Sequence, residues 1–183
     1  ATLWTALSPD NRTLLGKLEN AAFRTEYLTA ATTTTAARRT AILAAAALWT
    51  ALTPDNRTSL DKPENAAFKT EYLLATTTVA QRTAILAAAT LWTALTPDNR
   101  TLLDVSANAA LKTEYLTAAT LAARRTAILD TLLLAALSSE NRMLLDKSEN
   151  AVFKTEYLLE TTTAARRTAI LAEATLWTAL SPD

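Results

Sequence analysis

The chain has 183 residues, half of them hydrophobic, and its 18 basic and 18 acidic residues leave no net charge. A chain of this length and composition can bury a sizeable core. A neutral chain lacks the surplus of positive charge that drives binding to phosphate backbones. We therefore expect a folded protein that does not bind nucleic acid.

The chain contains no His and no Cys. Their absence excludes disulfides and thiolate metal sites, and it removes the usual general bases, nucleophiles and metal ligands. The longest apolar runs, such as residues 41–52, are much shorter than the roughly 20 residues of a membrane span. We expect no enzymatic activity, no cofactor, no bound metal and no membrane partner. The composition leaves the cellular compartment open, with the cytoplasm favoured.

The sequence is a tandem repeat with a period of about 43 residues, and its first ten residues, ATLWTALSPD, return unchanged as residues 174–183. Each copy starts at a Ser or Thr, and successive starts lie 45, 43 and 42 residues apart. The four starts are Ser8, Thr53, Thr96 and Ser138. Such periods are typical of solenoids and arrays. We expect one repeat domain over residues 1–183, with four copies and a partial C-terminal copy, belonging to a longer array.

Each copy opens with the pattern of a short helix. In the second copy Thr53 suits an N-cap and Pro54 the first helical position, and an acidic residue that faces the helix dipole follows. A second helix is expected to begin at Asp61, which forms the pattern of a capping box with Glu64. The chain's single glycine, a tolerated N-cap, takes the place of this Asp in the first copy.

A Thr-rich stretch, residues 76–78 in the second copy, follows the second helix. Thirteen residues separate Glu26 from Arg39 on either side of this stretch in the first copy, but eleven separate their counterparts in the other copies. Two extra residues inside a continuous helix would rotate everything downstream by about 200°, whereas a turn absorbs them. We therefore predict a turn, with a Thr capping a third helix that ends near Leu52 in the first copy.

The third copy departs from the others in its third helix. The segment between Ile128 and Leu137 is one residue shorter than its counterparts and lacks the Trp that they carry. A deletion inside a helix shifts its phase by about 100°, so this helix is expected to end early or to be kinked.

Three helices per 43 residues predict an all-α fold, a tandem-repeat right-handed α-solenoid in which each copy packs on its neighbours. The unit is similar to armadillo and HEAT repeats in size alone.

A turn between the second and third helices makes them an antiparallel pair and brings Glu114 opposite Arg125 and Glu156 opposite Arg167. We expect partly exposed ion pairs there, which fix the register of the two helices. The other Arg of each pair would then point outward as a line of basic residues. This line is either a solvated helix face or a site for an acidic or helical partner: Arg38, Arg124 and Arg166.

Large aromatic residues dominate cores, so each Trp is expected to cover the junction between its long helix and the next short one, with a ladder for ligands as the alternative. Both ends of the chain carry ordinary repeat sequence, where solenoids normally have polar caps. We therefore expect apolar surface at both ends and end-to-end stacking through Trp4, Leu7, Trp177 and Leu180.

Three copies carry the N-glycosylation pattern Asn-Arg-Thr, beginning at Asn11, Asn56 and Asn99. An Asn in the first turn of a helix is equally ordinary, so the pattern leaves glycosylation open.

Every copy carries nearly the same residues, whereas an active site needs one asymmetric constellation. The sequence therefore favours a non-enzymatic structural array, a spacer, scaffold or filament-forming component of cytoskeletal type that stacks end to end with itself. The alternative is an α-solenoid module that binds another protein, with an acidic or helical surface, along the Arg-lined face.

Overall fold

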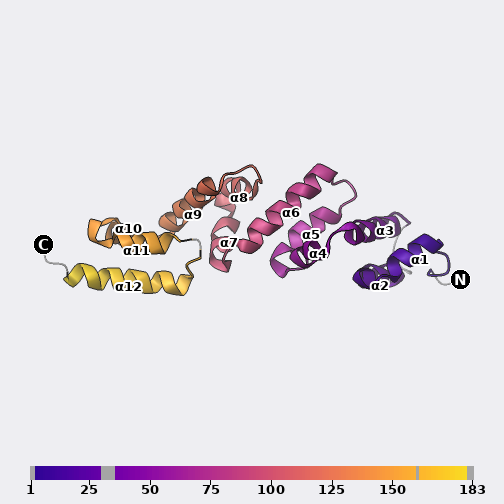
Figure 1. Cartoon of the computed structure of the whole chain (residues 1–183), viewed down its shortest axis with the longest axis horizontal. Coiled ribbons are helices and arrows are strands. Elements are labelled where there is room, and N and C mark those ends of the chain that lie inside the picture. The colour runs from indigo at the N-terminus through magenta and orange to yellow at the C-terminus, as the bar shows by residue number, and fades with distance from the viewer. Residues whose placement is uncertain (1–2, 30–35, 160, 181–183) are drawn as a thin grey trace. The chain divides into compact units, whose positions relative to one another are not determined.

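The computed structural model describes residues 3–29, 36–159 and 161–180. All the regular structure in these ranges is helical, which confirms the all-α fold (Figure 1). The helices form two compact units, Ala1–Thr90 and Leu91–Asp183. The boundary between the units falls inside the third helix of the second copy.

The first unit contains the first two copies of the repeat. Its helices are α1 (Pro9–Gly16), η1 (Leu18–Asn20), α2 (Ala21–Thr29), α3 (Ala36–Ala51), α4 (Pro54–Leu60), η2 (Pro63–Asn65), α5 (Ala66–Leu73) and most of α6 (Val79–Ala94), where η marks a 3-10 helix. The second unit contains the last two copies. Its helices are α7 (Pro97–Asp104), η3 (Ser106–Asn108), α8 (Ala109–Leu116), α9 (Ala122–Ala136), α10 (Ser139–Asp146), η4 (Ser148–Asn150), α11 (Ala151–Leu158) and α12 (Ala164–Leu180).

The four starts of the repeat are N-caps, as predicted. The hydroxyl of each accepts a hydrogen bond from the backbone N–H three residues later, at 3.3 Å for Ser8, Thr53 and Thr96 and 3.2 Å for Ser138. These bonds satisfy donors that the first turn of a helix leaves free. The helices that follow have seven or eight residues, so each is a short helix of about two turns.

The predicted capping box at Asp61 is wrong. Asp61 directly follows α4, and its φ of −78° and ψ of −9° are helical, so it does not have the extended conformation of an N-cap. The second segment begins instead with the 3-10 helix η2, and the Asp61 carboxylate accepts a hydrogen bond from Lys69 at 2.5 Å. For the same reason Gly16 is the last residue of α1 and not an N-cap.

The predicted turn in the Thr-rich stretch is confirmed in the copies that the structure describes there. In the second copy α5 ends at Leu73 and α6 begins at Val79. Thr78 caps α6 reciprocally with Gln81: its backbone N–H donates to the Gln81 side chain at 2.8 Å, and its hydroxyl accepts from the Gln81 N–H at 3.3 Å. The Thr163 hydroxyl caps α12 by accepting from the Arg166 N–H at 3.3 Å, whereas Leu121 precedes α9 without a side-chain cap. Residues 30–35, the turn of the first copy, lie outside the described ranges.

Of the two alternatives predicted for the third helix of the third copy, the early end is wrong and the kink stays a prediction. Helix α9 runs to Ala136, the counterpart of Ala51 in α3, but it has 15 residues instead of 16. The missing residue therefore lies in the interior of the helix, where it rotates the following side chains. Leu129 and Leu132 are buried in α9, whereas Leu43, the counterpart of Leu129 in the first copy, is partly exposed.

The hydrophobic cores repeat position by position. The second copy contributes residues from its three helices, and two further residues come from the end of α3, which belongs to the preceding copy. This cluster is Leu60, Tyr72, Ile85 and Ala89, with Trp49 and Leu52. The counterpart in the fourth copy is Leu145, Tyr157, Ile170 and Ala174, with Leu137 and, partly buried, Leu134. The cores of the second and fourth copies are therefore each completed by the end of the long helix before it.

The segment that completes each core has the sequence Leu-Trp-Thr-Ala-Leu, and we call it the tail of the long helix. The tails are residues 48–52, 91–95 and 176–180, and residues 133–137 are the altered tail of the third copy. The boundary between the two compact units supports this division, because it places residues 91–95 with the third copy, which follows them. Trp49 and Trp92 are each only 4% exposed. The predicted role of these Trp residues as core residues at a helix junction is thus confirmed.

Candidate functional site

In the arginine pairs at the start of the third helices, the two Arg residues have the opposite partners to those predicted. The first Arg of each pair binds the Glu: Arg124 contacts Glu114 at 2.6 Å and Arg166 contacts Glu156 at 2.7 Å. In the first copy Arg38 binds its Glu at 2.7 Å. The predicted pairing of these Glu residues with the second Arg is therefore wrong.

The second Arg of each pair closes the end of the second helix instead. The guanidinium of Arg167 donates to the carbonyl oxygens of Tyr157 at 2.9 Å and Leu159 at 3.2 Å, and it lies 5.8 Å from the centre of the Tyr157 ring. The last turn of a helix leaves carbonyls without partners inside the helix, and the guanidinium supplies their donors. Arg82 and Arg125 make the same contacts in their copies.

Burial explains why Arg167 and Arg166 differ although they are neighbours in sequence. Arg167 is 5% exposed, and desolvation lowers its pKa, although the charges of Tyr157 and Asp98 oppose this effect. The side chain of Arg166 is 42% exposed, and its hydrogen bonds to Glu156 and Glu173 raise its pKa. The buried Arg is a structural residue, while the exposed Arg remains accessible to a partner.

The predicted partner site is therefore a set of ion pairs. Arg38 lies in the first unit, and Arg124 and Arg166 lie in the second. Each guanidinium is exposed but has a Glu beside it. A partner with an acidic surface would compete with these carboxylates, and the role of the three residues in binding stays a prediction.

A second candidate site is the surface that receives a tail. In the first unit the following copy places the Lys69 ammonium 4.5 Å from the centre of the Trp49 ring, and Arg57 donates to the carbonyl of Leu52 at 2.7 Å. In the second unit the corresponding contacts are Lys112 over Trp92 at 4.5 Å and Arg100 to Leu95 at 2.9 Å. The receiving surface thus combines apolar side chains, a Lys ammonium over the Trp ring of the tail and an Arg guanidinium that donates to the last carbonyl of the tail.

The roles of these Lys and Arg residues were not predicted from the sequence. The signal was present, because an Asn-Arg pair follows each start of the repeat at the same distance. The roles of Asn20 and Asn150, which are fully buried, were not predicted either. The amide of Asn150 donates to the carbonyl of Leu144 and to the hydroxyl of Thr178, both at 2.8 Å, and so ties the first segment of the copy to its long helix.

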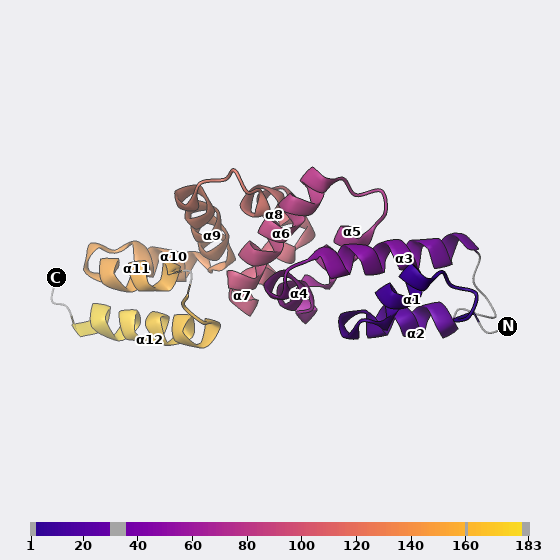
Figure 2. The same ribbon diagram turned by 45° about the vertical axis from the view of Figure 1, so that its right-hand side comes forward.

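The tail of α12 differs from the other tails in its exposure. Leu176 is 66% exposed, Trp177 51% and Leu180 78%. Trp49 and Leu52, at the matching positions of the tail of α3, are 4% and 6% exposed. In Figures 1 and 2 this tail is the yellow end of α12 that lies nearest to the label C. An apolar surface that other copies of the same sequence bury is a candidate interface.

The other predicted contact residues, Trp4 and Leu7, lie in the first unit. Leu7 is 6% exposed and Trp4 is partly buried, and both pack against the core of the first copy. Residues 3–7 are therefore packed on the core of the first copy, whereas residues 176–180 expose their large apolar side chains.

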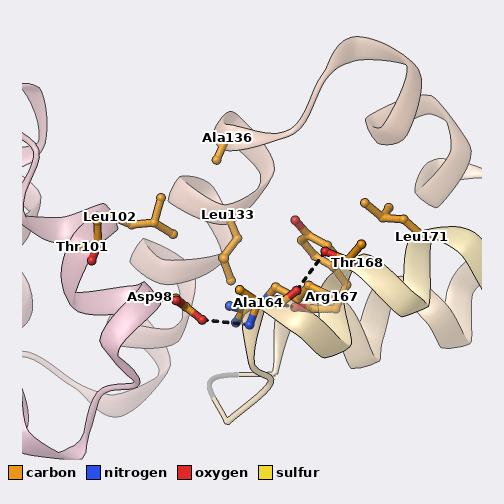
Figure 3. A pocket seen from close by; sticks show the side chains of 10 residues that line it. Asp98, Thr101, Leu102, Leu133, Ala136, Ala164, Arg167, Thr168 and Leu171 are labelled. Atoms are coloured by element: carbon orange, nitrogen blue, oxygen red, sulfur yellow. Dashed lines mark hydrogen bonds between the residues drawn. The ribbon is translucent and has the colours of Figure 1, made fainter.

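The second unit also contains a groove of about 360 Å³ between α7, α9, α11 and α12 (Figure 3). The Asp98 carboxylate accepts a hydrogen bond from the backbone N–H of Ala164 at 2.8 Å, at the first residue of α12. Arg167 binds carbonyls at the same groove. Both charged groups of this groove thus have partners within the fold, so what it offers a ligand is mainly apolar surface.

A groove of about 460 Å³ lies between α9 and α11 and contains Asp130, which replaces an Ala of the other copies. Burial raises the pKa of Asp130, and its Oδ1 atom accepts no hydrogen bond from the described residues. The remaining lining is uncharged: Thr126, Thr155, Leu158 and Leu159. Burial therefore disfavours the ionised form of this carboxyl group, and the groove holds no second acidic residue beside it.

The glycosylation pattern lies in helices. Asn99 is fully buried, while Asn11 and Asn56 are partly buried. The Thr hydroxyls of the three patterns donate to the carbonyls four residues earlier in the same helices, at 3.0 Å. A glycan on Asn99 would require this helix to unfold.

Among residues 3–29, 36–159 and 161–180, no group of acidic residues is arranged to hold a metal ion. Within the same ranges no helix is both long and apolar enough to cross a membrane. Comparison with known protein families, with curated proteins and with solved structures gave no match.

Proposed function

We propose that this protein is a non-enzymatic structural repeat array whose copies stack as an α-solenoid and which associates end to end with itself. The observation that carries the proposal is that the tails of α3 and α6 are each buried by the copy that follows them. The tail of α12 has the same five-residue sequence. A second chain that offers the surface of a following copy would bury Leu176, Trp177 and Leu180 in the same way.

The expected association is weak. Burying the exposed parts of these three side chains gives about 3–6 kcal/mol, at about 1.5–3 kcal/mol for each fully buried large apolar side chain. The loss of translational and rotational freedom opposes it by an amount of the same order or larger. The cation over the indole and the guanidinium on the last carbonyl add to the favourable side. These opposing contributions nearly cancel, so association would be weak and is to be sought between roughly 10 µM and 1 mM.

The proposal has a direct test in sedimentation velocity over this concentration range. The wild-type chain is expected to form dimers and longer species as its concentration rises. The variant Leu180→Asp places a charge in the proposed interface and should remain a monomer. A matched control is Leu121→Asp, because Leu121 is 77% exposed and lies outside the tails. A wild-type chain that stays monomeric at 1 mM, or equal association of both variants, refutes the proposal.

Binding of another protein along the arginine residues receives less support. Arg38, Arg124 and Arg166 each contact a Glu, so their charges are balanced locally. The tails, in contrast, bind the same kind of surface in more than one copy, and no described contact of the three Arg residues joins one copy to the next in this way. We therefore favour association through the tails.

A further inference from the structure

The third copy has an acidic residue where the other three copies have Ala. Asp130 lies in the middle of α9 and aligns with Ala44, Ala87 and Ala172. Ala has the highest helix propensity, so an Asp in its place lowers the stability of the helix, and the burial of the carboxylate lowers it further. Such a residue, when no contact within the fold compensates for it, is expected at a functional site.

No contact among the described residues compensates for the burial of the Asp130 carboxylate. Its Oδ1 atom is buried and accepts no hydrogen bond from them. Burial is the one cause that raises the pKa of this carboxyl group, and no described charged group acts against it. The two basic residues of α9 have other partners: Arg124 binds Glu114 at 2.6 Å, and Arg125 donates to the carbonyl of Tyr115 at 2.8 Å.

Asp130 lines the groove of about 460 Å³ between α9 and α11, two helices that pack against each other within the second unit. Thr126 lies about one turn before Asp130, so the two side chains share a face of α9. Leu158 and the half-exposed Leu159 form an apolar wall at the end of α11. The volume is within the range of small-molecule sites, about 300–1,000 Å³.

Thr155 adds a hydrogen-bond acceptor to this groove. Its hydroxyl donates to the carbonyl of Ala151 at 2.9 Å, so the proton is used and the oxygen keeps its lone pairs. The ionised carboxylate of Asp130 can only accept. An ammonium group has three donors and no acceptor, and it carries the opposite charge. The polar groups of the groove therefore match an ammonium group.

A groove at the matching place in the first unit lacks this free charge. It has about 330 Å³ and lies between α3 and α5, and its wall at the end of α5 consists of Thr70, Leu73 and Leu74, which match the α11 wall position by position. The charged residues that line it, Glu26 and Arg38, bind each other at 2.7 Å. The groove at α9 thus differs from its counterpart by a negative charge without a partner.

We propose that the groove between α9 and α11 binds a small organic cation, a protonated primary amine attached to an apolar group. The ammonium group lies against the Asp130 carboxylate and the two Thr hydroxyls, and the apolar group packs on Leu158 and Leu159. A charge-assisted hydrogen bond is stronger in such a partly desolvated place than in water. A single carboxylate with apolar neighbours cannot replace the water shell of a metal ion, which needs about six oxygen ligands. The groove lies outside the tails, so this inference does not depend on the proposed end-to-end association.

The test is a titration of the full chain with hexylamine, followed by the backbone amide signals of α9 and α11 in NMR spectra. Hexylamine is protonated at neutral pH, and 1-hexanol is a neutral molecule of nearly the same shape. Hexylamine should shift the signals of residues 126–130 and 155–159 with a dissociation constant of about 1 mM, as expected for so small a ligand. The alcohol, which lacks the charge, and methylamine, which lacks the apolar group, should each bind at least tenfold more weakly.

Two variants separate the groove from the general charge of the protein. Asp130→Asn keeps the shape of the side chain and removes its charge, so it should weaken hexylamine at least tenfold and abolish the preference over 1-hexanol. The matched control is Glu140→Gln, which removes an exposed acidic group of α10 in the same unit and should bind hexylamine as the wild type does. Both variants should fold, because Asp130 opposes folding and Glu140 is exposed.

Equal binding of hexylamine by the wild type and Asp130→Asn, or no shift of these signals at about 10 mM hexylamine, overturns the proposal. N-acetyl-lysine amide carries the same ammonium group on a peptide unit, and it distinguishes a free amine from a lysine of a partner protein. It should bind more weakly than hexylamine, because its polar amides cannot pack on Leu158 and Leu159. If it binds as tightly or more tightly, the groove receives a protein lysine and the proposal of a free amine fails.

Discussion

Replacing Arg167 with Ala should destabilise the second unit far more than the same change at its neighbour Arg166. Arg167 is 5% exposed and makes two hydrogen bonds, to the carbonyls of Tyr157 and Leu159. Hydrogen bonds of a charged group contribute about 1.5–3 kcal/mol each, and the contact with the Tyr157 ring adds about 0.5–1 kcal/mol. The desolvation that lowers the pKa of Arg167 offsets part of this sum.

We therefore expect Arg167→Ala to lower the free energy of unfolding by about 3 kcal/mol. For a chain of this length the melting temperature would fall by roughly 6–12 °C. Arg166→Ala should leave the melting temperature nearly unchanged, because its ion pairs with Glu156 and Glu173 are exposed.

The assay is urea unfolding followed by circular dichroism, with calorimetry for the melting temperature. Arg167→Lys serves as a second comparison. It keeps the charge, but one ammonium cannot hold both carbonyls as the planar guanidinium does, so most of the loss should remain. Equal effects of Arg166→Ala and Arg167→Ala, or no effect of the latter, would refute the assignment of the second Arg as the residue that closes the helix.

Three further changes test the packing of the copies. Asp130→Ala should stabilise the chain at pH 7, because burial raises the pKa of Asp130 and its ionisation therefore opposes folding; the gain should shrink as the pH falls toward 3.8, and a gain that does not depend on pH would contradict this reasoning. Asn150→Ala should cost about 1–3 kcal/mol in urea unfolding, since it leaves the carbonyl of Leu144 without its donor; an unchanged midpoint would show that water replaces the amide. Leu60→Ala should cost about 2–5 kcal/mol because Leu60 is fully buried, and a loss below 1 kcal/mol would argue against the shared core.

Much of the fold could be predicted from the sequence because the repeat supplies internal controls. The change in spacing between Glu26 and Arg39 indicated a turn, and in the second copy that turn is closed by Thr78 and Gln81. The Ser or Thr before each first helix indicated an N-cap, because an extended residue with a short hydroxyl side chain satisfies a free N–H. These features depend on neighbours in sequence, which are visible without coordinates.

The errors arose where a residue had two available partners. Asp61 fits a capping box, but it is the C-cap of α4 and its side chain accepts a hydrogen bond from Lys69. Glu114 lies at a similar distance in sequence from Arg124 and Arg125, and the register of the helix pair decides between them. Free carbonyls at the end of α8 attract the second Arg, and spacing in sequence does not record such groups.

The residues of the candidate interface could be predicted from the sequence, but which of them are buried and which are exposed could not. The sequence placed Trp4, Leu7, Trp177 and Leu180 at equivalent positions and so treated the two ends alike. Their difference arises from the chain itself, since residues 3–7 fold back onto the first copy and cover one of the two surfaces.

Photo-crosslinking from the α12 tail tests the central claim most directly. The photoreactive amino acid benzoylphenylalanine in place of Trp177 preserves an apolar aromatic group at an exposed position. Irradiation at a concentration where the chain associates should link this residue to α1 or α2 of a second copy, near Phe23 and Tyr27, as mass spectrometry of the crosslinked peptides would show. Crosslinks that map to other surfaces of the second copy, or that form only within one chain, would contradict the claim.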